Sequence, residues 1–398
     1  MPNSNLKLFL EINIKEFVFI VGKIDHNNSL NIKYKLAVPL KGIENNRISN
    51  FEDVYTIIKE NIYLVEQKFD YTFKELVLIL ENFNPSFVSL TGYKKLNGSQ
   101  ILRENITYIL NMLKNCIEET ELKKTIIHIF NSKFYLDSKK IENLPIGLFG
   151  DFYSHELSFS LIGSNIYKNL INIFENCNLR VKKILLKSFI KGANINNYNK
   201  DVDTFFQIKL NENNSKIFFF ENNSLKFEQN FEFGLGIIIQ DIFKITTLKI
   251  DTIMGILSKM KLTENVSDEM FVEKDFFKED NYIKLKKKLI NEITLARIKE
   301  ISEILLFKNV NFQYFSKVSK NIFLEIDQKF LFDNFKVNFN KILSKGGQNK
   351  VEFINPISTD DLLITANKLV HFGWKNEAIP ISSPKKSLIA RFFDAIFG

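Results

Sequence analysis

The stretch LKLFLEINIKEFVFIVGKID, residues 6–25, decides the fold of this chain. Its apolar residues form two runs on either side of a polar turn near Asn13–Glu16, a pattern that predicts two antiparallel strands. Residues 30–40, LNIKYKLAVPL, alternate in part and predict a third strand. Residues 51–69 carry apolar side chains at helical spacing, and residues 76–80 form a short apolar run. This order of three strands, a helix and a strand predicts an α/β domain.

The rest of the chain continues and then repeats this alternation. After the turn at Asn84-Pro85, the pattern predicts helices over 101–117 and 166–175 and strands over 125–130 and 159–162. A second set of three strands follows, over 205–210, 215–220 and 225–233. Further helices are predicted over 237–245, 283–307 and 360–372, and further strands over 321–326 and 351–354. Two halves that each begin with a β-meander predict a duplicated pair of sheet-plus-helix domains, although no residue-level repeat links them.

Composition limits the class of protein. The chain has 398 residues, of which 45% are hydrophobic, with only 15 Gly and 7 Pro. At about 150 residues per domain, this length predicts two to three compact units. The formal net charge is +8, but only five of the 54 basic residues are arginine. Lysine in place of arginine, beside abundant Asn, Ile and Phe, is typical of an AT-rich genome, so we do not expect nucleic-acid binding.

The cysteines bear on the cellular compartment of the protein, and the histidines bear on metal binding. Cys116 and Cys177 lie far apart, and no secretory signal precedes the first strand, so we expect a cytoplasmic protein with free thiols. The four histidines are not at metal-ligand spacing, and therefore we expect no metal site. No window approaches the run of about 18 apolar residues that a membrane-spanning helix needs.

The segment HIFNSKFYLDSKKIENLPIGLFG, residues 128–150, resembles the bacterial cell-division protein FtsA, an actin-like membrane tether for the tubulin-like FtsZ. The resemblance rests on His128, Phe134, Asp137, Asn143, Pro145, Gly147, Leu148 and Gly150, with Leu144 as one extra residue. Weaker matches follow in the same order at ENCNLRV, FGLGIIIQDI, the helix with Arg297, TANKLVHFG and SLIARFFDAIFG.

The resemblance implies an α/β fold of the actin-like, ribonuclease-H-like duplicated kind, with an FtsA-type extra subdomain and a C-terminal amphipathic helix. It divides the chain into a lower subdomain 1A, an inserted subdomain 1C, an upper subdomain 2A, a peripheral subdomain 2B, a linker and a membrane-targeting helix. These correspond to residues 1–83 with 163–200, 84–162, 201–247 with 316–373, 248–315, 374–384 and 385–398.

The resemblance also places the nucleotide site of the actin-like ATPases, whose glycine-rich hairpin turns let backbone N–H groups converge on phosphate. The two phosphate turns fall on residues 11–16 and 207–214, the strand end beside adenosine on 323–327, and the ribose ligands on 253–257. The glycines, hydroxyls and charged groups of the family pattern are missing there. We therefore expect no enzyme activity and no cofactor, with ATP as the alternative left open.

One acidic residue could belong to a residual nucleotide site. Asp241 follows Gly234 and Gly236 in the matching order. Its alternative role is that of a carboxylate at a helix start, where the helix dipole favours negative charge.

The family's partners map onto other residues. The resemblance implies that the FtsZ C-terminal peptide binds beside Arg297, and we add Lys287 of the same lysine-rich helix. A guanidinium grips a carboxylate bidentately, which an ammonium cannot do. The resemblance further implies a head-to-tail homo-oligomer through residues 84–162, and contacts with proteins that join division later.

The C-terminal segment KKSLIARFFDAIFG predicts an amphipathic helix after the linker WKNEAIPISSP. An anionic membrane surface is its expected partner, and a helix docked on the protein's own core is the alternative. The expected membrane-binding residues are Lys385, Lys386, Leu388, Ile389, Arg391, Phe392, Phe393, Ile396 and Phe397.

Together these inferences predict a cell-division protein that tethers the FtsZ ring to the cytoplasmic face of the inner membrane and self-assembles there. The alternative is an actin-superfamily ATPase or chaperone-like enzyme with a divergent nucleotide site. A basic nucleic-acid-binding module is a third class, and the scarcity of arginine counts against it.

Overall fold

The computed structural model describes residues 6–25, 30–81, 83–260, 269–277, 281–344 and 347–372. The described residues of Met1–Lys187 and of Ala366–Gly398 form one compact unit, and those of Ser188–Thr365 form the second. The chain therefore passes between the units twice, at the start of α4 (Lys187–Tyr198) and within α10 (Thr359–Phe372).

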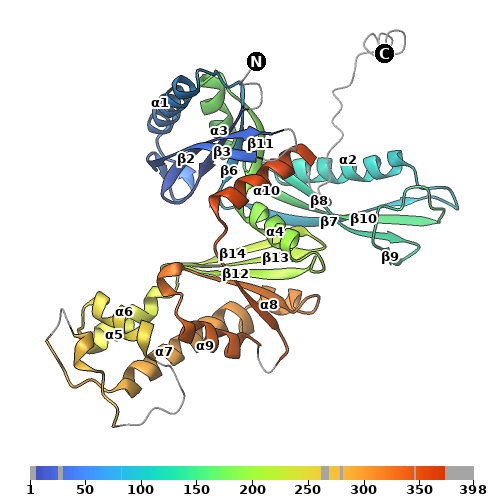
Figure 1. Cartoon of the computed structure of the whole chain (residues 1–398). Coiled ribbons are helices and arrows are strands. Elements are labelled where there is room, and N and C mark those ends of the chain that lie inside the picture. Colours follow the sequence, from blue (N-terminus) through green and yellow to red (C-terminus); the bar gives the residue numbers. More distant parts are fainter. Residues whose placement is uncertain are drawn as a thin grey trace. The chain divides into compact units, whose positions relative to one another are not determined.

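The first unit contains a five-stranded sheet in the order β11-β6-β1-β2-β3 (Figure 1). β1 (Leu6–Ile12), β2 (Glu16–Ile24) and β3 (Leu30–Pro39) form the predicted antiparallel meander. β6 (Glu75–Leu80) pairs in parallel with β1, and β11 (Arg180–Leu186) in parallel with β6. Most side chains of β1, β2 and β6 are buried, as expected for central strands covered on both faces.

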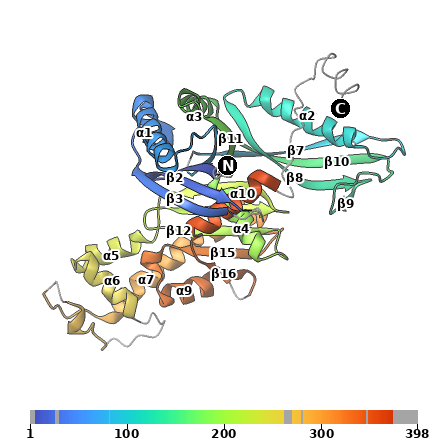
Figure 2. The ribbon, with the colours of Figure 1, turned by 45° about the horizontal axis from the view of Figure 1, so that its top comes forward.

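Two helices pack side by side on this sheet, α1 (Phe51–Phe69) and α3 (Ser164–Asn176), as Figure 2 shows. α1 begins where the Asn50 side chain accepts a hydrogen bond from the Asp53 N–H and ends at Asp70 in the left-handed region. The short strands β4 (Ile43–Glu44) and β5 (Arg47–Ile48) form a separate hairpin. α1 matches the helix that the sequence predicted.

A four-stranded antiparallel sheet is inserted in the first unit, in the order β7-β10-β8-β9. It consists of β7 (Ser86–Lys95), β8 (Lys124–Leu136), β9 (Lys139–Ile141) and β10 (Phe152–Gly163). α2 (Arg103–Thr120) packs on one face of it through apolar side chains (Figure 2). The sequence predicted α2, the first half of β8 and the C-terminal end of β10, but not β7.

The second unit repeats the topology of the first sheet. β12 (Phe205–Leu210), β13 (Ser215–Glu221) and β14 (Ser224–Phe231) form an antiparallel meander. β15 (Asn321–Ile326) is parallel to β12, and β16 (Lys350–Ile354) is parallel to β15. The order β14-β13-β12-β15-β16 therefore matches β3-β2-β1-β6-β11 strand for strand, which confirms the predicted duplication.

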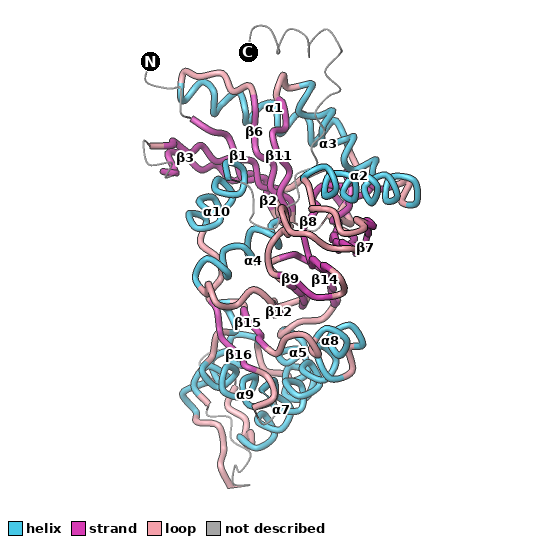
Figure 3. Tube along the Cα trace, turned by 90° about the vertical axis from the view of Figure 1, so that its right-hand side faces the viewer, coloured by secondary structure: helices cyan, strands magenta, loops and turns pink. Residues whose placement is uncertain are grey.

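The remaining helices of the second unit lie close together in Figure 3, and their apolar side chains share one extensive core. They are α5 (Gly236–Thr246), α6 (Ile250–Lys259), α7 (Lys287–Ser302), α8 (Val310–Phe315) and α9 (Asp333–Ser344), with 3-10 turns at Lys274–Phe276 and Gln328–Phe330. α7 begins four residues after the predicted start and runs into a π-helical turn, Glu303–Phe307. Within the ranges described above, every helix is too short or too polar to span a bilayer.

Candidate functional site

The first predicted phosphate turn joins β1 to β2 and satisfies its own backbone. The Asn13 side-chain Oδ1 accepts hydrogen bonds from the N–H groups of Lys15 at 2.8 Å and Glu16 at 2.9 Å. In residues 11–16, all of which the structure describes, none has a positive φ. An anion-binding nest needs an alternation of right- and left-handed residues, so this turn lacks the geometry that cradles phosphate.

The second predicted phosphate turn, between β12 and β13, is covered by the start of α5. The N–H groups of Leu235 and Gly236 each donate at 2.8 Å, to the carbonyls of Asn211 and Glu212. A Cβ on Gly234 would lie 2.2 Å from the Asn211 carbonyl oxygen, so only glycine permits this approach. Gly234 and Gly236 thus serve backbone packing against the turn, and the fully described turn residues 211–214 again have no positive φ.

At the carboxyl ends of β1, β6 and β11, one ammonium group lies between two carboxylates. Lys187 Nζ donates to Glu11 Oε1 at 2.6 Å and to Glu81 Oε2 at 2.8 Å. All three side chains are largely buried. Burial disfavours the charged ammonium, but the charges of Glu81 and Glu11 and the hydrogen bonds to them outweigh it and raise the pKa of Lys187.

The corresponding edge of the second sheet also carries an internal charge cluster. Glu325, near the end of β15, lies 3.3 Å from Lys191 Nζ and 3.7 Å from Lys209 Nζ. Gln207, the first residue of the second predicted phosphate turn, donates to Glu325 at 3.5 Å. A cavity of about 350 Å³ adjoins these residues, lined also by Ile195, Tyr198, Ile354 and Asp361. At both sheet edges, carboxylates therefore form ion pairs with lysine side chains of the same unit.

The structure joins two residues that the sequence assigned to different sites. Arg297 on α7 forms ion pairs with Asp241 on α5 and with Glu300 on its own helix. α5 begins at Gly236, so Asp241 is not in the first turn, and the helix-start interpretation is wrong. The Arg297 side chain is 31% exposed.

Lys287 does not share a site with Arg297. It lies at the start of α7, where it pairs with Glu273. Ten residues of helix separate the two cations by about 15 Å along the axis. Of the two residues predicted to bind the FtsZ peptide, Arg297 therefore forms ion pairs with two carboxylates, and Lys287 forms one with Glu273.

The sequence missed an apolar surface on the inserted sheet. The backbone of residues 98–102 pairs with the β9–β10 loop, with Ile101 N–H donating to Leu148 O at 2.8 Å and Gly147 N–H to Ile101 O at 2.9 Å. The exposed side chains of this inserted-sheet patch are Leu102 (50%), Ile146 (46%), Leu148 (48%), Phe149 (70%) and Phe152 (48%). An exposed apolar cluster of this kind marks an interaction surface. The apolar run PIGLFGDF was its signal.

The core of the inserted sheet contains an unpaired imidazole. His155 on β10 is fully buried beside Phe134 and Tyr153. Among the residues that the structure describes, neither ring nitrogen has a hydrogen-bond partner. Burial lowers the pKa of His155 to about 4, although Glu156 raises it in part. This histidine is neutral at physiological pH and carries no chemistry.

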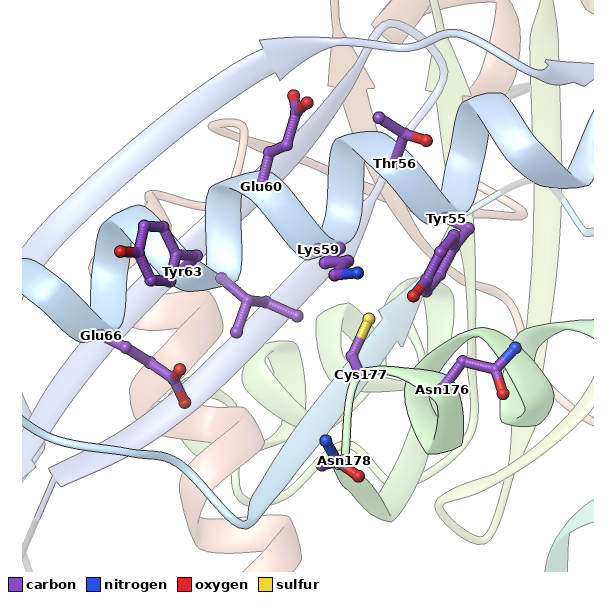
Figure 4. Close-up of a pocket in the computed structure, with 10 residues that line it drawn as sticks. Tyr55, Thr56, Lys59, Glu60, Tyr63, Glu66, Asn176, Cys177 and Asn178 are labelled. Atoms are coloured by element: carbon purple, nitrogen blue, oxygen red, sulfur yellow. The ribbon is translucent and has the colours of Figure 1, made fainter.

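A cavity of about 500 Å³ lies between α1 and the turn from α3 to β11 (Figure 4). Tyr55, Lys59 and Tyr63 line it from α1, and Cys177 from the turn. Burial raises the pKa of the Cys177 thiol, Glu66 adds to this and Lys59 opposes it. Cys177 and Cys116 are both free thiols, as predicted, but the protonated Cys177 is a poor nucleophile.

The predicted membrane-binding residues, from Lys385 to Phe397, lie outside the described residues, as does the linker before them.

Comparison with known proteins adds a sequence relationship and a fold. No family model matches the chain. It is 23% identical over 183 residues to cell division protein FtsA of Buchnera aphidicola subsp. Schizaphis graminum, which covers 46% of this chain and 43% of that protein. It is 18% identical over 193 residues to FtsA of Escherichia coli K12, covering 48% and 46%. The matches thus span about half the length of these curated relatives.

Among solved structures, the PilM-PilN type IV pilus biogenesis complex matches with a TM-score of 0.50 and 9% identity, covering 94% of this chain and 98% of that one. This likeness concerns the fold alone. The predicted actin-like fold is confirmed.

Proposed function

We propose that this chain is a cell-division protein of the FtsA type, which binds the C-terminal peptide of FtsZ, assembles with itself and attaches the filament to the cytoplasmic face of the inner membrane. The similarity to FtsA of two bacteria supports the division role. The inserted-sheet patch supports self-assembly, because its apolar side chains are exposed in a single copy of the chain.

A structural rather than a catalytic role is supported by the contacts at the two predicted phosphate turns and at the adjoining sheet edges. The N–H groups of the first turn bind the Asn13 side chain, and the second turn is covered by the backbone of residues 234–236. The carboxylates at both edges already have lysine partners. A nucleotide would have to displace these contacts, so we propose that the protein works without ATP hydrolysis.

Calorimetric titration with ATP and Mg²⁺ is expected to give no binding heat at millimolar nucleotide. The reason is that neither of the two predicted phosphate turns, residues 11–16 and 211–214, contains a residue in the left-handed region. A known actin-like ATPase titrated under the same conditions is the positive control. Saturable heat with a Kd in the micromolar range would contradict the proposal and favour the divergent ATPase.

Substitution of Arg297 by glutamate is expected to weaken binding of an FtsZ C-terminal peptide by on the order of 2 kcal/mol or more, or about thirtyfold. The change removes the cation and adds a third carboxylate beside Asp241 and Glu300. Fluorescence anisotropy of a labelled peptide measures the affinity.

The ion pair between Arg297 and Asp241 provides a second test, in which the affinity for the peptide should rise instead of fall. Because Asp241 competes with an acidic peptide for Arg297, Asp241→Asn is expected to strengthen peptide binding several-fold. Lys317→Glu, at an exposed position of the second unit outside α7, controls for a general change of charge. Equal affinities of wild type, Arg297→Glu and Asp241→Asn would remove Arg297 from the site.

A further inference from the structure

The cavity of about 500 Å³ in the first unit is a groove along one side of α1. Tyr55, Lys59 and Tyr63 follow one another at intervals of four residues, so their side chains lie on the same side of the helix, over about 12 Å of its length. The opposite wall is the turn 176–178, and in Figure 4 the side chains of Tyr55 and Lys59 point toward Cys177 in that turn. This cavity is termed the α1 groove below.

The α1 groove suits apolar side chains. Ile62 lines it, and the ring of Tyr63 is 59% exposed at its wall. Leu64, the next residue of α1, is 54% exposed. The volume of about 500 Å³ is within the range of cavities that enclose a drug-sized molecule, so it has room for several side chains of a protein segment. A concave surface with exposed aromatic and aliphatic side chains is typical of a binding site.

The described part of the chain ends near this groove. His371, in the last turn of α10, contacts Lys7 at the start of β1. In the sheet, Leu8 of β1 is opposite Leu76 of β6, and Leu76 is opposite Val181 of β11. Two strand spacings, or about 10 Å, therefore separate β1 from β11 at this point. Val181 follows the groove turn 176–178 by three residues, so α10 ends at the edge of the sheet where the groove lies.

The segment that follows α10 is long enough to reach the groove. The path crosses two strand spacings, three residues along β11 and one packing layer, which together amount to roughly 30 Å. Residues 373–386 can span up to about 45 Å when extended. A segment that begins near residue 387 can therefore lie in the α1 groove of its own chain.

Residues 387–398 match the groove in length and in charge. On the predicted helix, the apolar residues of this segment recur along one face over about 14 Å; they are Leu388, Ile389, Phe392, Phe393, Ile396 and Phe397. Residues 385–398 carry three basic side chains and one acidic side chain. The groove contributes two carboxylates, of Glu60 and Glu66, against the one ammonium of Lys59. The opposite net charges of the two surfaces favour their association.

We propose that the α1 groove receives the apolar face of residues 387–398, the same segment that we expect to bind the membrane. The groove and the membrane then compete, because both cover the same apolar face. Tethering gives the segment an effective concentration on the order of 1 mM, so an intrinsic Kd of about 0.1 mM fills the groove in roughly nine molecules of ten. The inference deepens the proposed function and rests on it for the competition with lipid, whereas docking itself is tested without lipid.

Cys177 reports whether the groove is occupied, because it is a free thiol in the groove wall. The experiment measures the rate at which N-ethylmaleimide modifies Cys177 in the full chain and in a chain that ends at Pro384, at the same pH and without lipid. Removal of residues 385–398 is expected to speed this modification about tenfold, since the groove is open in roughly one molecule of ten of the full chain. Cys116, an exposed thiol on α2, is the internal reference and should react equally in both chains.

Substitutions on α1 locate the docking site. Tyr63→Glu places a carboxylate at the groove wall, so Cys177 in this variant should react as fast as in the shortened chain. Tyr93→Glu makes the same change at an exposed tyrosine of β7, and should keep Cys177 protected. Tyr63→Glu in the shortened chain should not change the rate further, which controls for a direct effect of the new carboxylate on the thiol.

Equal rates of Cys177 modification in the full and shortened chains overturn the proposal. Protection that grows over about a hundredfold range of protein concentration also overturns it, because the occupant is then the segment of a second copy. Anionic vesicles should raise the rate in the full chain to that of the shortened chain, and neutral vesicles should not. Protection that persists in protein sedimented with anionic vesicles overturns the competition. Protein that stays protected but does not sediment contradicts the proposed membrane attachment and supports the docking.

Discussion

Replacing both Phe392 and Phe393 by aspartate is expected to abolish co-sedimentation with anionic liposomes. On the proposed amphipathic helix, each phenylalanine contributes roughly 1.5–3 kcal/mol of apolar burial. The loss of both corresponds to at least about a hundredfold weaker partitioning, and two new carboxylates add repulsion from anionic lipid. The measurement is the fraction of protein pelleted with vesicles that contain acidic phospholipid.

A matched control separates apolar burial from charge. Ser382→Asp with Ser383→Asp adds the same two charges in the linker, a few residues before the helix. Each charge there changes binding by only about 1 kcal/mol, so this variant should still sediment. Wild-type sedimentation of the Phe392→Asp, Phe393→Asp variant would favour the alternative helix docked on the protein's core.

Acid is expected to loosen the inserted sheet, and His155→Leu should suppress the effect. The pKa of His155 is about 4 in the folded protein and 6.5 in an ordinary environment. Above pH 6.5 the histidine is neutral in both states and contributes nothing. Between pH 6.5 and 4 only the unfolded state binds the proton, so the free energy of unfolding falls, by about 3 kcal/mol in total at the low end.

Hydrogen exchange of peptides from β8 and β10, measured at pH 7 and pH 4 and corrected for the intrinsic exchange rate, reports this local stability. The strands β12 and β15 of the same molecule serve as the internal reference. Leucine fills a similar volume without a titratable nitrogen, so the extra loss in β8 and β10 should vanish in the variant. An identical pH dependence in wild type and His155→Leu would contradict the assignment.

The strands that the sequence predicted best are those buried on both faces. β6 and β13 contain continuous apolar runs, Leu76–Leu80 and Ile217–Phe220, because neither face meets water. β7 was missed because it is a half-exposed edge strand in which serine, threonine, glycine and lysine alternate with apolar residues. Its partner β10 supplies the hydrogen bonds that hold it.

The helix α4 could not be predicted from propensity. It contains Gly192 and several asparagines, which disfavour helix. Packing overrides this preference, since the Phe220 ring lies 2.1 Å from where a Cβ of Gly192 would be, and Phe189 and Ile190 are fully buried. Tertiary contact therefore decides this segment.

The candidate sites depend on contacts between residues far apart in the sequence, which residue spacing along the chain does not predict. Lys187 meets Glu11 from 176 residues away, and Arg297 meets Asp241 from 56 residues away. The sequence could show that the phosphate turns lack glycine. It could not show that a side chain and a neighbouring backbone already occupy the hydrogen-bonding groups of those turns.

The two passages of the chain between its compact units determine how the proposed tether would carry tension. A pull between the membrane end, which follows α10, and the Arg297 region of the second unit is shared by two peptide segments in parallel, at Lys187–Ser188 and Thr365–Ala366. Both segments belong to helices. A helical residue lengthens from about 1.5 Å to about 3.3 Å when it is drawn out. If these segments were drawn out, the covalent path between the two units would lengthen as residues of α4 and α10 leave the helix.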